Sequence, residues 1–438
     1  MDKPKIIKSE LFQVLSIKSF QLLWSSQVIT QTAYNMLLFI LGVIIYQKTR
    51  SNAQVSLFYL TVGIPAFVFG IISGIYVDKF NKRSILLLST FIRIILLILI
   101  VIFRHQLLIV FILSGLVSIV GQFFVPAEAA LIPRLVKQEL LLSANSLFTL
   151  TFYSAVIGGF VFAGPLLRQF GTTPVLIFLA FLYLLSTVLL YFLPKNLGTT
   201  NTANKSFPLS EMKQDVLSAI SFIKKVIPVK QAMLLMMMSQ AVISIFLTLA
   251  PGMADQLLKI EVTDASILIM GPAALGMIVG ALIIGNLGSR FRKRSLIQLG
   301  IYASGLILIF LSSVIYFKNY EVVSDLFELI FYNKISQAIL IITSLCFFIL
   351  GFANSLIDIS CNTILQQYST DGNRGRIYGV LQSLISGLSL LPVIISGLLA
   401  DVIGINKIIF VLGLCLTVFG LFASGFFKKL MKENNQSI

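Results

Sequence analysis

This chain contains several apolar stretches of about 20 residues that carry almost no charge. Residues 85–103 hold one charge, Arg93, and residues 174–193 hold none. Over 438 residues the sequence is 57% hydrophobic and only 11% charged, so it has too little polar surface to cover an apolar core in water. Each stretch is long enough to cross a bilayer as a helix. The sequence therefore predicts an all-α membrane protein.

We predict twelve transmembrane helices: residues 20–46, 54–77, 84–103, 106–127, 144–168, 171–193, 231–254, 265–288, 295–317, 335–361, 377–400 and 405–427. The longest polar stretch, residues 194–230, is predicted to be a cytoplasmic linker. It would join an N-terminal six-helix bundle, residues 1–193, to a C-terminal one, residues 231–438. A second polar piece, residues 318–333, predicts a short interfacial helix.

The net charge of +16 has a distribution that favours a membrane protein over a nucleic-acid-binding one. Most Lys and Arg residues fall on alternate connections between apolar runs, which is the pattern of cytoplasmic loops. This predicts that both termini are cytoplasmic. We expect no cleavable signal peptide at the N-terminus, and the short tails suit a bacterial plasma membrane. The three cysteines lie inside apolar runs without metal-site spacing, so we expect no metal and no cofactor.

A twelve-residue stretch occurs twice, beginning at Gly74 and again at Gly285, with five identical aligned positions. Each copy ends one apolar run and begins the next. The offset is close to half the chain, so the sequence indicates two related helical halves. Internal duplication of this kind is typical of secondary transporters, which bind substrate between the halves.

The repeated turn is a candidate gate. We interpret Asp78 as a latch that bonds the N-terminus of a neighbouring helix, or an Arg, and breaks when the halves move. The alternative is a plain basic turn at the cytoplasmic surface. The gating-turn residues are Gly74, Asp78, Lys79, Lys82 and Arg83, and in the second copy Arg290, Lys293 and Arg294.

The first copy resembles the signature turn of the major facilitator superfamily, G-x-x-x-D-R/K-x-G-R/K-R/K, with Asn81 in place of the family glycine. Residues 123–133, 144–147, 374–379 and 396–404 are similar to the macrolide-efflux and enterobactin-exporter-like branch. The antiporter signature of helix five is present only in part, at residues 158–165. The resemblance implies twelve helices in two pseudo-symmetric bundles and a transporter that works by alternating access.

Three charged residues are candidates for ion coupling: Arg93 near the middle of span three, and Glu128 and Asp358 toward the cytoplasmic ends of spans four and ten. Glu128 and Asp358 occupy equivalent positions in the two halves, since Gly121 aligns with Gly351 at the same offset. A partly buried carboxylate can carry a coupling proton. The alternatives are an Arg buried against helix-end carbonyls, and salt bridges from the acids to Arg83, Arg134, Arg374 or Arg376 at a gate.

Polar residues of the first span share one helical face and are candidates for lining a cavity. In the superfamily, spans one and seven line the central cavity, which adds candidates from later spans. The candidates are Gln27, Gln31, Tyr34, Asn35, Gln240, Ser244 and Asn354. Hydrogen bonding between helices would explain the same pattern. Asp255, near the outer end of span seven, is expected in an outer vestibule.

The resemblance implies proton-coupled efflux of a small amphipathic or hydrophobic compound of drug, macrolide or siderophore type. The alternative is a lysolipid or lipid-like molecule moved without protons. A polytopic membrane enzyme is less well supported, because the single histidine, His105, lies in a short turn and no nucleotide-binding motif is present. The expected partners are a small-molecule substrate, protons and the lipid bilayer, for a monomer that does not bind nucleic acid.

Overall fold

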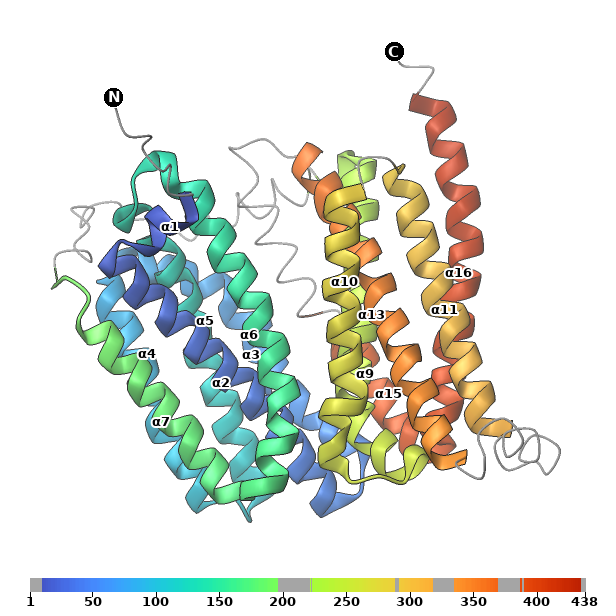
Figure 1. Ribbon diagram of the computed structural model, residues 1–438, viewed down its shortest axis with the longest axis horizontal. Helices are drawn as coiled ribbons and strands as arrows, with labels where there is room; N and C mark the ends of the chain where they lie inside the picture. Colours follow the sequence, from blue (N-terminus) through green and yellow to red (C-terminus); the bar gives the residue numbers. More distant parts are fainter. Residues whose placement is uncertain are drawn as a thin grey trace, which may run out of the picture. The chain divides into compact units, whose positions relative to one another are not determined.

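The computed structural model describes residues 10–195, 221, 223–287, 291–317, 335–368, 387 and 390–434, and the regular elements in these ranges are all helical. The first of them, coloured from blue to green in Figure 1, are α1 Glu10–Leu15, α2 Lys18–Thr49, α3 Asn52–Lys79, α4 Lys82–Ile102, α5 Leu107–Leu135, the short η1 Gln138–Leu140, α6 Leu141–Phe170 and α7 Thr172–Tyr191.

The later elements begin with α9 Ile227–Gly252, which continues into the π-helical turn η3 Met253–Leu258. Then come η4 Val262–Asp264, η5 Ser266–Met270, α10 Gly271–Leu287, α11 Lys293–Phe317, α13 Ile335–Tyr368, α15 Leu390–Ile403 and α16 Ile405–Asn434. The predicted linker 194–230 lies mostly outside the described residues, and the predicted interfacial helix 318–333 lies wholly outside them.

Each of the twelve predicted spans corresponds to a helix over the residues that the structure describes, which for span 377–400 are residues 387 and 390–400, and this confirms an all-α membrane fold. In the described part of the chain, ten helices are long and apolar enough to cross a membrane, and two more, Ser154–Phe170 and Leu390–Ile403, are shorter apolar helices. Several helices run past the predicted ends, for example α5 to Leu135. Continuing the helix keeps backbone groups hydrogen-bonded where water is scarce.

The chain divides into two compact units. The first unit comprises Met1–Ile44 and Leu60–Lys213, and the second comprises Ile45–Tyr59 and Gln214–Ile438. The main division falls inside the predicted linker. The short segment 45–59 is the exception, because it contains the end of α2 and the start of α3 but belongs to the second unit.

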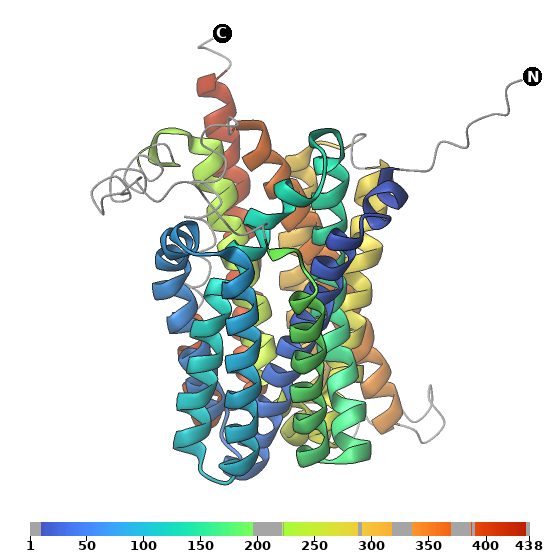
Figure 2. The same cartoon turned by 90° about the vertical axis from the view of Figure 1, so that its left-hand side faces the viewer.

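Helices of the first unit pack around an apolar core at the α1–α2 end of the bundle. This core contains Val14, Phe20, Leu86, Phe124, Leu131, Phe148 and Leu190, all buried. Helix α4 lies beside α5 and α7, as Figure 1 shows for α4 and α7. Within each unit the axes of the long helices are roughly parallel or antiparallel (Figure 2), as those of helices that cross a bilayer are.

In the second unit, α13 packs against α9, α10 and α11. Close contact between α10 and α13 depends on glycine: a Cβ on Gly276 would lie 1.9 Å from the carbonyl oxygen of Phe348, and one on Gly280 would lie 1.9 Å from Ser355 Oγ. Small residues of this kind let membrane helices approach closely.

The two halves share a turn that the sequence repeat does not include. Gly171 joins α6 to α7 with φ of +77°, and Gly404 joins α15 to α16 with φ of +90°. The amide of each glycine donates to the carbonyl four residues earlier, Leu167 or Ala400. Only glycine adopts such a backbone without strain, so equivalent turns join the last two helices of each half.

Candidate functional site

Arg93 lies within an aromatic cage in the first unit. Its guanidinium carbon is 5.6 Å from the ring centroid of Tyr34, 5.7 Å from that of Phe124 and 5.4 Å from that of Tyr183, rings that belong to α2, α5 and α7. The side chain is buried, and Gly121 leaves space for Nη2. Aromatic faces attract a cation electrostatically, which offsets part of the cost of holding a charge among apolar helices.

Glu128 is buried on α5, one helical turn after Phe124, and its carboxylate interacts electrostatically with Arg93. The structure thus brings together two of the three predicted coupling residues and one predicted cavity residue, Tyr34. Among the described residues, neither Glu128 Oε1 nor Arg93 Nε has a hydrogen-bond partner. The hydroxyl of Tyr183, a ring of the same cage, also has no partner among the described residues, so this buried site retains polar groups that the described fold does not use.

Asp358, the third predicted coupling residue, lies in a separate cluster within the second unit. Its Oδ2 accepts a hydrogen bond from Gln240 Nε2 at 3.2 Å, and its carboxylate also accepts one from the Ser239 hydroxyl. The Asn354 amide donates to the same hydroxyl. The structure therefore joins three predicted site residues of α9 and α13. Oδ1 has no partner among the described residues.

Among the first-span residues predicted to line a cavity, one forms hydrogen bonds to another helix and one forms a hydrogen bond within its own helix. Gln27 donates to the carbonyl of Phe148 at 3.3 Å and accepts from Thr151 at 3.3 Å, so it bonds α2 to α6, which is the alternative explanation given above. Asn35 packs beside Gly159 of α6, and its amide bonds the carbonyl of Gln31 in its own helix. Ser244 likewise donates within α9, to the carbonyl of Gln240.

The described gating-turn residues lie at helix ends, and Arg83 also contacts a neighbouring helix of the first unit. Arg83 Nη2 donates to the carbonyl of Tyr191 at 2.6 Å and its guanidinium covers the Tyr191 ring at 5.7 Å, so it caps the C-terminus of α7. Lys82 is buried at the start of α4. Gly74, Asp78 and Lys79 belong to the end of α3, whereas Arg290 lies outside the described residues. Lys293 and Arg294 begin α11.

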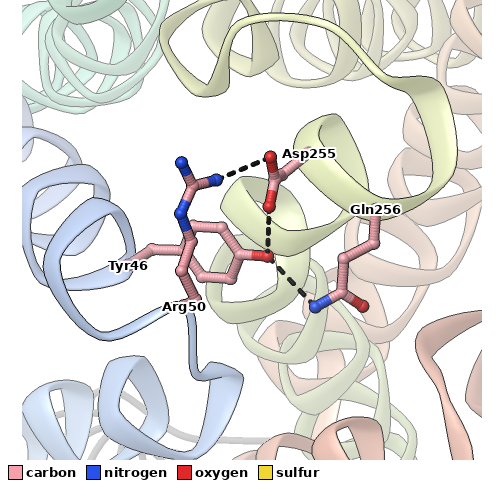
Figure 3. Close-up of polar contacts among 4 residues, drawn as sticks. All are labelled: Tyr46, Arg50, Asp255 and Gln256. Carbon is pink, nitrogen blue, oxygen red and sulfur yellow. Dashed lines mark hydrogen bonds and ion pairs between the residues drawn. The ribbon is translucent and has the colours of Figure 1, made fainter.

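A polar cluster that the sequence did not predict joins the end of α2 to η3 (Figure 3). Arg50 Nη1 donates to Asp255 Oδ1 at 2.7 Å, and the Tyr46 hydroxyl donates to Asp255 Oδ2 at 3.1 Å. Gln256 Nε2 in turn donates to the Tyr46 oxygen at 3.1 Å. Asp255, which we expected in an outer vestibule, is hydrogen-bonded on both carboxylate oxygens.

Asp401 forms a second contact near the same segment, just beyond the predicted span 377–400. Its carboxylate accepts hydrogen bonds from the Ser51 hydroxyl at 2.5 Å, from the Asn52 amide and side chain, and from the Ala53 amide. Burial alone would raise the pKa of this carboxyl, but these hydrogen bonds outweigh burial and hold the pKa below its ordinary value. Asp401 is therefore an anion that caps the first turn of α3.

Residues 23–391 match the family model described as Major Facilitator Superfamily. A curated relative, the "Uncharacterized MFS-type transporter YfiS" of Bacillus subtilis (strain 168), is 24% identical over 411 residues, which cover 92% of each chain. Among solved structures, nucleoside transporter NupG aligns with a TM-score of 0.70 at 15% identity, covering 94% of this chain and 99% of that one. A bacterial homologue of the human lysosomal transporter Spinster aligns with a TM-score of 0.69 at 14% identity, covering 96% and 98%.

Proposed function

Since the chain belongs to the Major Facilitator Superfamily, we propose that this multi-pass membrane transporter is a proton-coupled exporter of a small amphipathic or hydrophobic compound. The family identifies a transporter rather than an enzyme. The direction of transport rests on the resemblance of residues 123–133 and 374–379 to the macrolide-efflux and enterobactin-exporter-like branch. The distribution of Lys and Arg supports cytoplasmic termini in a bacterial plasma membrane, and we propose that the protein works as a monomer.

The observation that supports proton coupling is the position of two acids inside membrane helices, one in each unit. Glu128 is buried beside Arg93, and Asp358 is bonded by Gln240 and Ser239. Each carboxylate retains an oxygen without a partner among the described residues. A carboxylate held among apolar helices is costly, and taking up a proton removes that cost. In each unit the acid can therefore alternate between a charged and a protonated form during transport.

The first prediction tests this coupling in proteoliposomes that contain a pH-sensitive dye. Macrolides, siderophores, lysolipids, nucleosides and peptides are presented in turn, and proton movement is recorded together with substrate movement. We expect one compound class to drive proton flux in the wild type. Glu128→Gln and Asp358→Asn should each abolish that flux, because an amide cannot carry the proton.

The matched control is Glu139→Gln, which removes an exposed acid of the same unit and should leave the flux unchanged. Substrate movement without proton flux, unchanged in both acid variants, would contradict proton coupling. If the transported compound were then a lysolipid, the protein would be a lysolipid transporter that works without protons, and not a proton-coupled exporter. Nucleoside or peptide transport would retain coupling but change the substrate class.

A further inference from the structure

Asp358 is a charged side chain within the apolar span Gln337–Leu365 of α13. Among the described residues, no Lys or Arg forms an ion pair with this carboxylate or lies close enough to compensate its charge. Its polar neighbours are neutral, since Gln240 Nε2 and the Ser239 hydroxyl donate hydrogen bonds to it. The second unit therefore holds a carboxylate whose countercharge does not come from the described part of the chain.

The acid of the first unit differs from Asp358 in this respect. Arg93 is the neighbouring cation of Glu128, so the two side chains are neutral together when both are charged. An uncompensated carboxylate in a membrane helix is costly, and a polar cluster that serves only to join helices normally satisfies its buried atoms. Asp358 Oδ1 accepts no hydrogen bond from any described residue. This oxygen is available to a cation from outside the chain.

Asp358 belongs to a polar face of α9 and α13 that is partly accessible. Gln240, Asn354 and Asp358 are half-buried, and so is Ser244, one turn after Gln240 on α9. Asn354 lies one turn before Asp358, so both share one side of α13. The Asn354 amide donates to the Ser239 hydroxyl, which in turn donates to Asp358. Hydrogen bonds thus join these groups into one polar site whose members keep accessible surface.

The donors around the carboxylate indicate which kind of cation fits. Gln240 Nε2 and the Ser239 hydroxyl present hydrogens to Asp358, whereas a hard metal ion needs about six oxygen ligands. Within this cluster, Oδ1 is the carboxylate oxygen that accepts nothing from the described side chains. One such oxygen is enough for a protonated amine, because a single N–H directed at a carboxylate forms a charge-assisted hydrogen bond. The site therefore favours an ammonium group over a metal ion.

An apolar side chain on the same face of α9 suits the rest of an amphipathic compound. Met237 is half-buried and lies one helical turn before Gln240, whereas the adjacent Met236 is buried in the core that α9 shares with α11 and α13. Methionine is flexible and polarizable, so it packs against apolar groups of different shapes. Helix α9 thus carries an adaptable apolar side chain on the face that carries the polar site.

We propose that Asp358 binds the protonated amine of a cationic amphipathic substrate. The ammonium donates to Oδ1, the side chains of Gln240 and Asn354 bond polar groups beside the amine, and Met237 contacts the apolar part. Asp358 then has two roles, since an ammonium and a proton each neutralise the carboxylate. This inference rests on the proposed transport of a small amphipathic compound, which it narrows to organic cations, and it concerns residues of the second unit alone.

The second prediction compares two fluorescent probes that differ by one charge. Dansylcadaverine carries a primary ammonium at the end of an apolar chain, and its N-acetyl derivative is neutral. Binding of each probe to the purified full-length protein in detergent is measured by the increase in dansyl fluorescence. We expect the wild type to bind the amine about tenfold or more tightly than the acetylated probe, because only the amine forms a charge-assisted hydrogen bond with the carboxylate.

Three substitutions test whether Asp358 is the source of this preference. Asp358→Asn should weaken binding of the amine about tenfold or more. It should leave binding of the acetylated probe unchanged, which also shows that the variant is folded. Asp358→Glu keeps the charge and should keep the preference for the amine. Glu261→Gln is the matched control, because it removes an exposed acid of the same unit and should change neither affinity.

Several results would overturn the amine site. They are equal affinity of the wild type for the two probes, no binding of dansyl amines with shorter or longer chains, and an amine preference that persists in Asp358→Asn. Displacement of the amine when sodium replaces potassium at constant ionic strength would also overturn it, by making Asp358 a metal-ion site. The assay needs neither a proton gradient nor transport. Amine preference without proton flux would contradict only the proposed coupling, and proton flux without amine preference would contradict only the amine site.

Discussion

At the scale of single residues, the first unit holds a buried cation, Arg93, among apolar helices. Arg93 occupies a site that three aromatic rings and one glycine shape, with Glu128 as the neighbouring anion. The sequence showed these residues as separate charges and rings, spread over α2, α4, α5 and α7. Their convergence explains how α4 carries an arginine in the middle of an apolar run, since the charge is shared with aromatic faces and a carboxylate.

The third prediction concerns Gly121→Ala. The added Cβ would lie 2.3 Å from Arg93 Nη2, so the guanidinium, which lies among three aromatic rings, must shift to make room. We expect a loss of stability of about 1–3 kcal/mol, measured as a lower midpoint of thermal unfolding in detergent. Gly158→Ala is the control, because its nearest neighbour, a ring carbon of Phe162, is 3.8 Å away. Equal midpoints for the two variants would show that Arg93 moves freely.

At the scale of helices, contacts between backbones decide how the second unit packs. Gly351 of α13 faces the carbonyl of Ala273, and Gly276 of α10 faces that of Phe348, so each helix supplies glycine where the other approaches. Dispersion and close backbone contact are the forces available between helices in lipid, because burial from water contributes little there. The pair α10–α13 is therefore sensitive to single methyl groups.

The fourth prediction follows from this contact. Gly276→Ala places Cβ 1.9 Å from a backbone oxygen, which cannot rotate away as a side chain can, so the two helices must separate. We expect the free energy of unfolding to fall by about 1–3 kcal/mol, measured as a lower midpoint of thermal unfolding in detergent. Gly70→Ala is the control. The nearest atom to its added Cβ is Gln122 Oε1 at 3.7 Å, an ordinary contact distance, so this variant should keep its stability. A Gly276 variant as stable as this control would contradict the close approach.

At the scale of the whole molecule, the arrangement of spans determines which connections face which side. The fifth prediction is that a cysteine at Lys407, in the first turn of α16, reacts with an impermeant maleimide outside intact cells, whereas one at Arg292, just before α11, reacts only after the membrane is opened. Both positions are exposed, so accessibility reports the side of the membrane. The reverse pattern would invert the proposed orientation.

Sequence alone determined the features that depend on local chemistry. The length of each apolar segment indicated which segments form membrane helices. A helix satisfies its own backbone hydrogen bonds, and its total hydropathy is the sum over its residues, so neither property depends on the rest of the fold. The repeated turn indicated duplication and the superfamily, and the family match confirmed the superfamily. The acids Glu128 and Asp358 were identifiable because charge is rare in such helices.

Tertiary structure alone decided which side chains meet. It placed Arg83 on the last carbonyl of α7, Gln27 between α2 and α6, and residues 50–53 against Asp401 and Asp255. These outcomes depend on the rotation and the approach of helices that are far apart in sequence, which lipid-facing composition does not encode. The sequence around Gly252 and Gly397 does not distinguish them from other glycines. The structure shows why each lacks a side chain: Asn52 fills the space beside Gly252, and Ser56 fills the space beside Gly397.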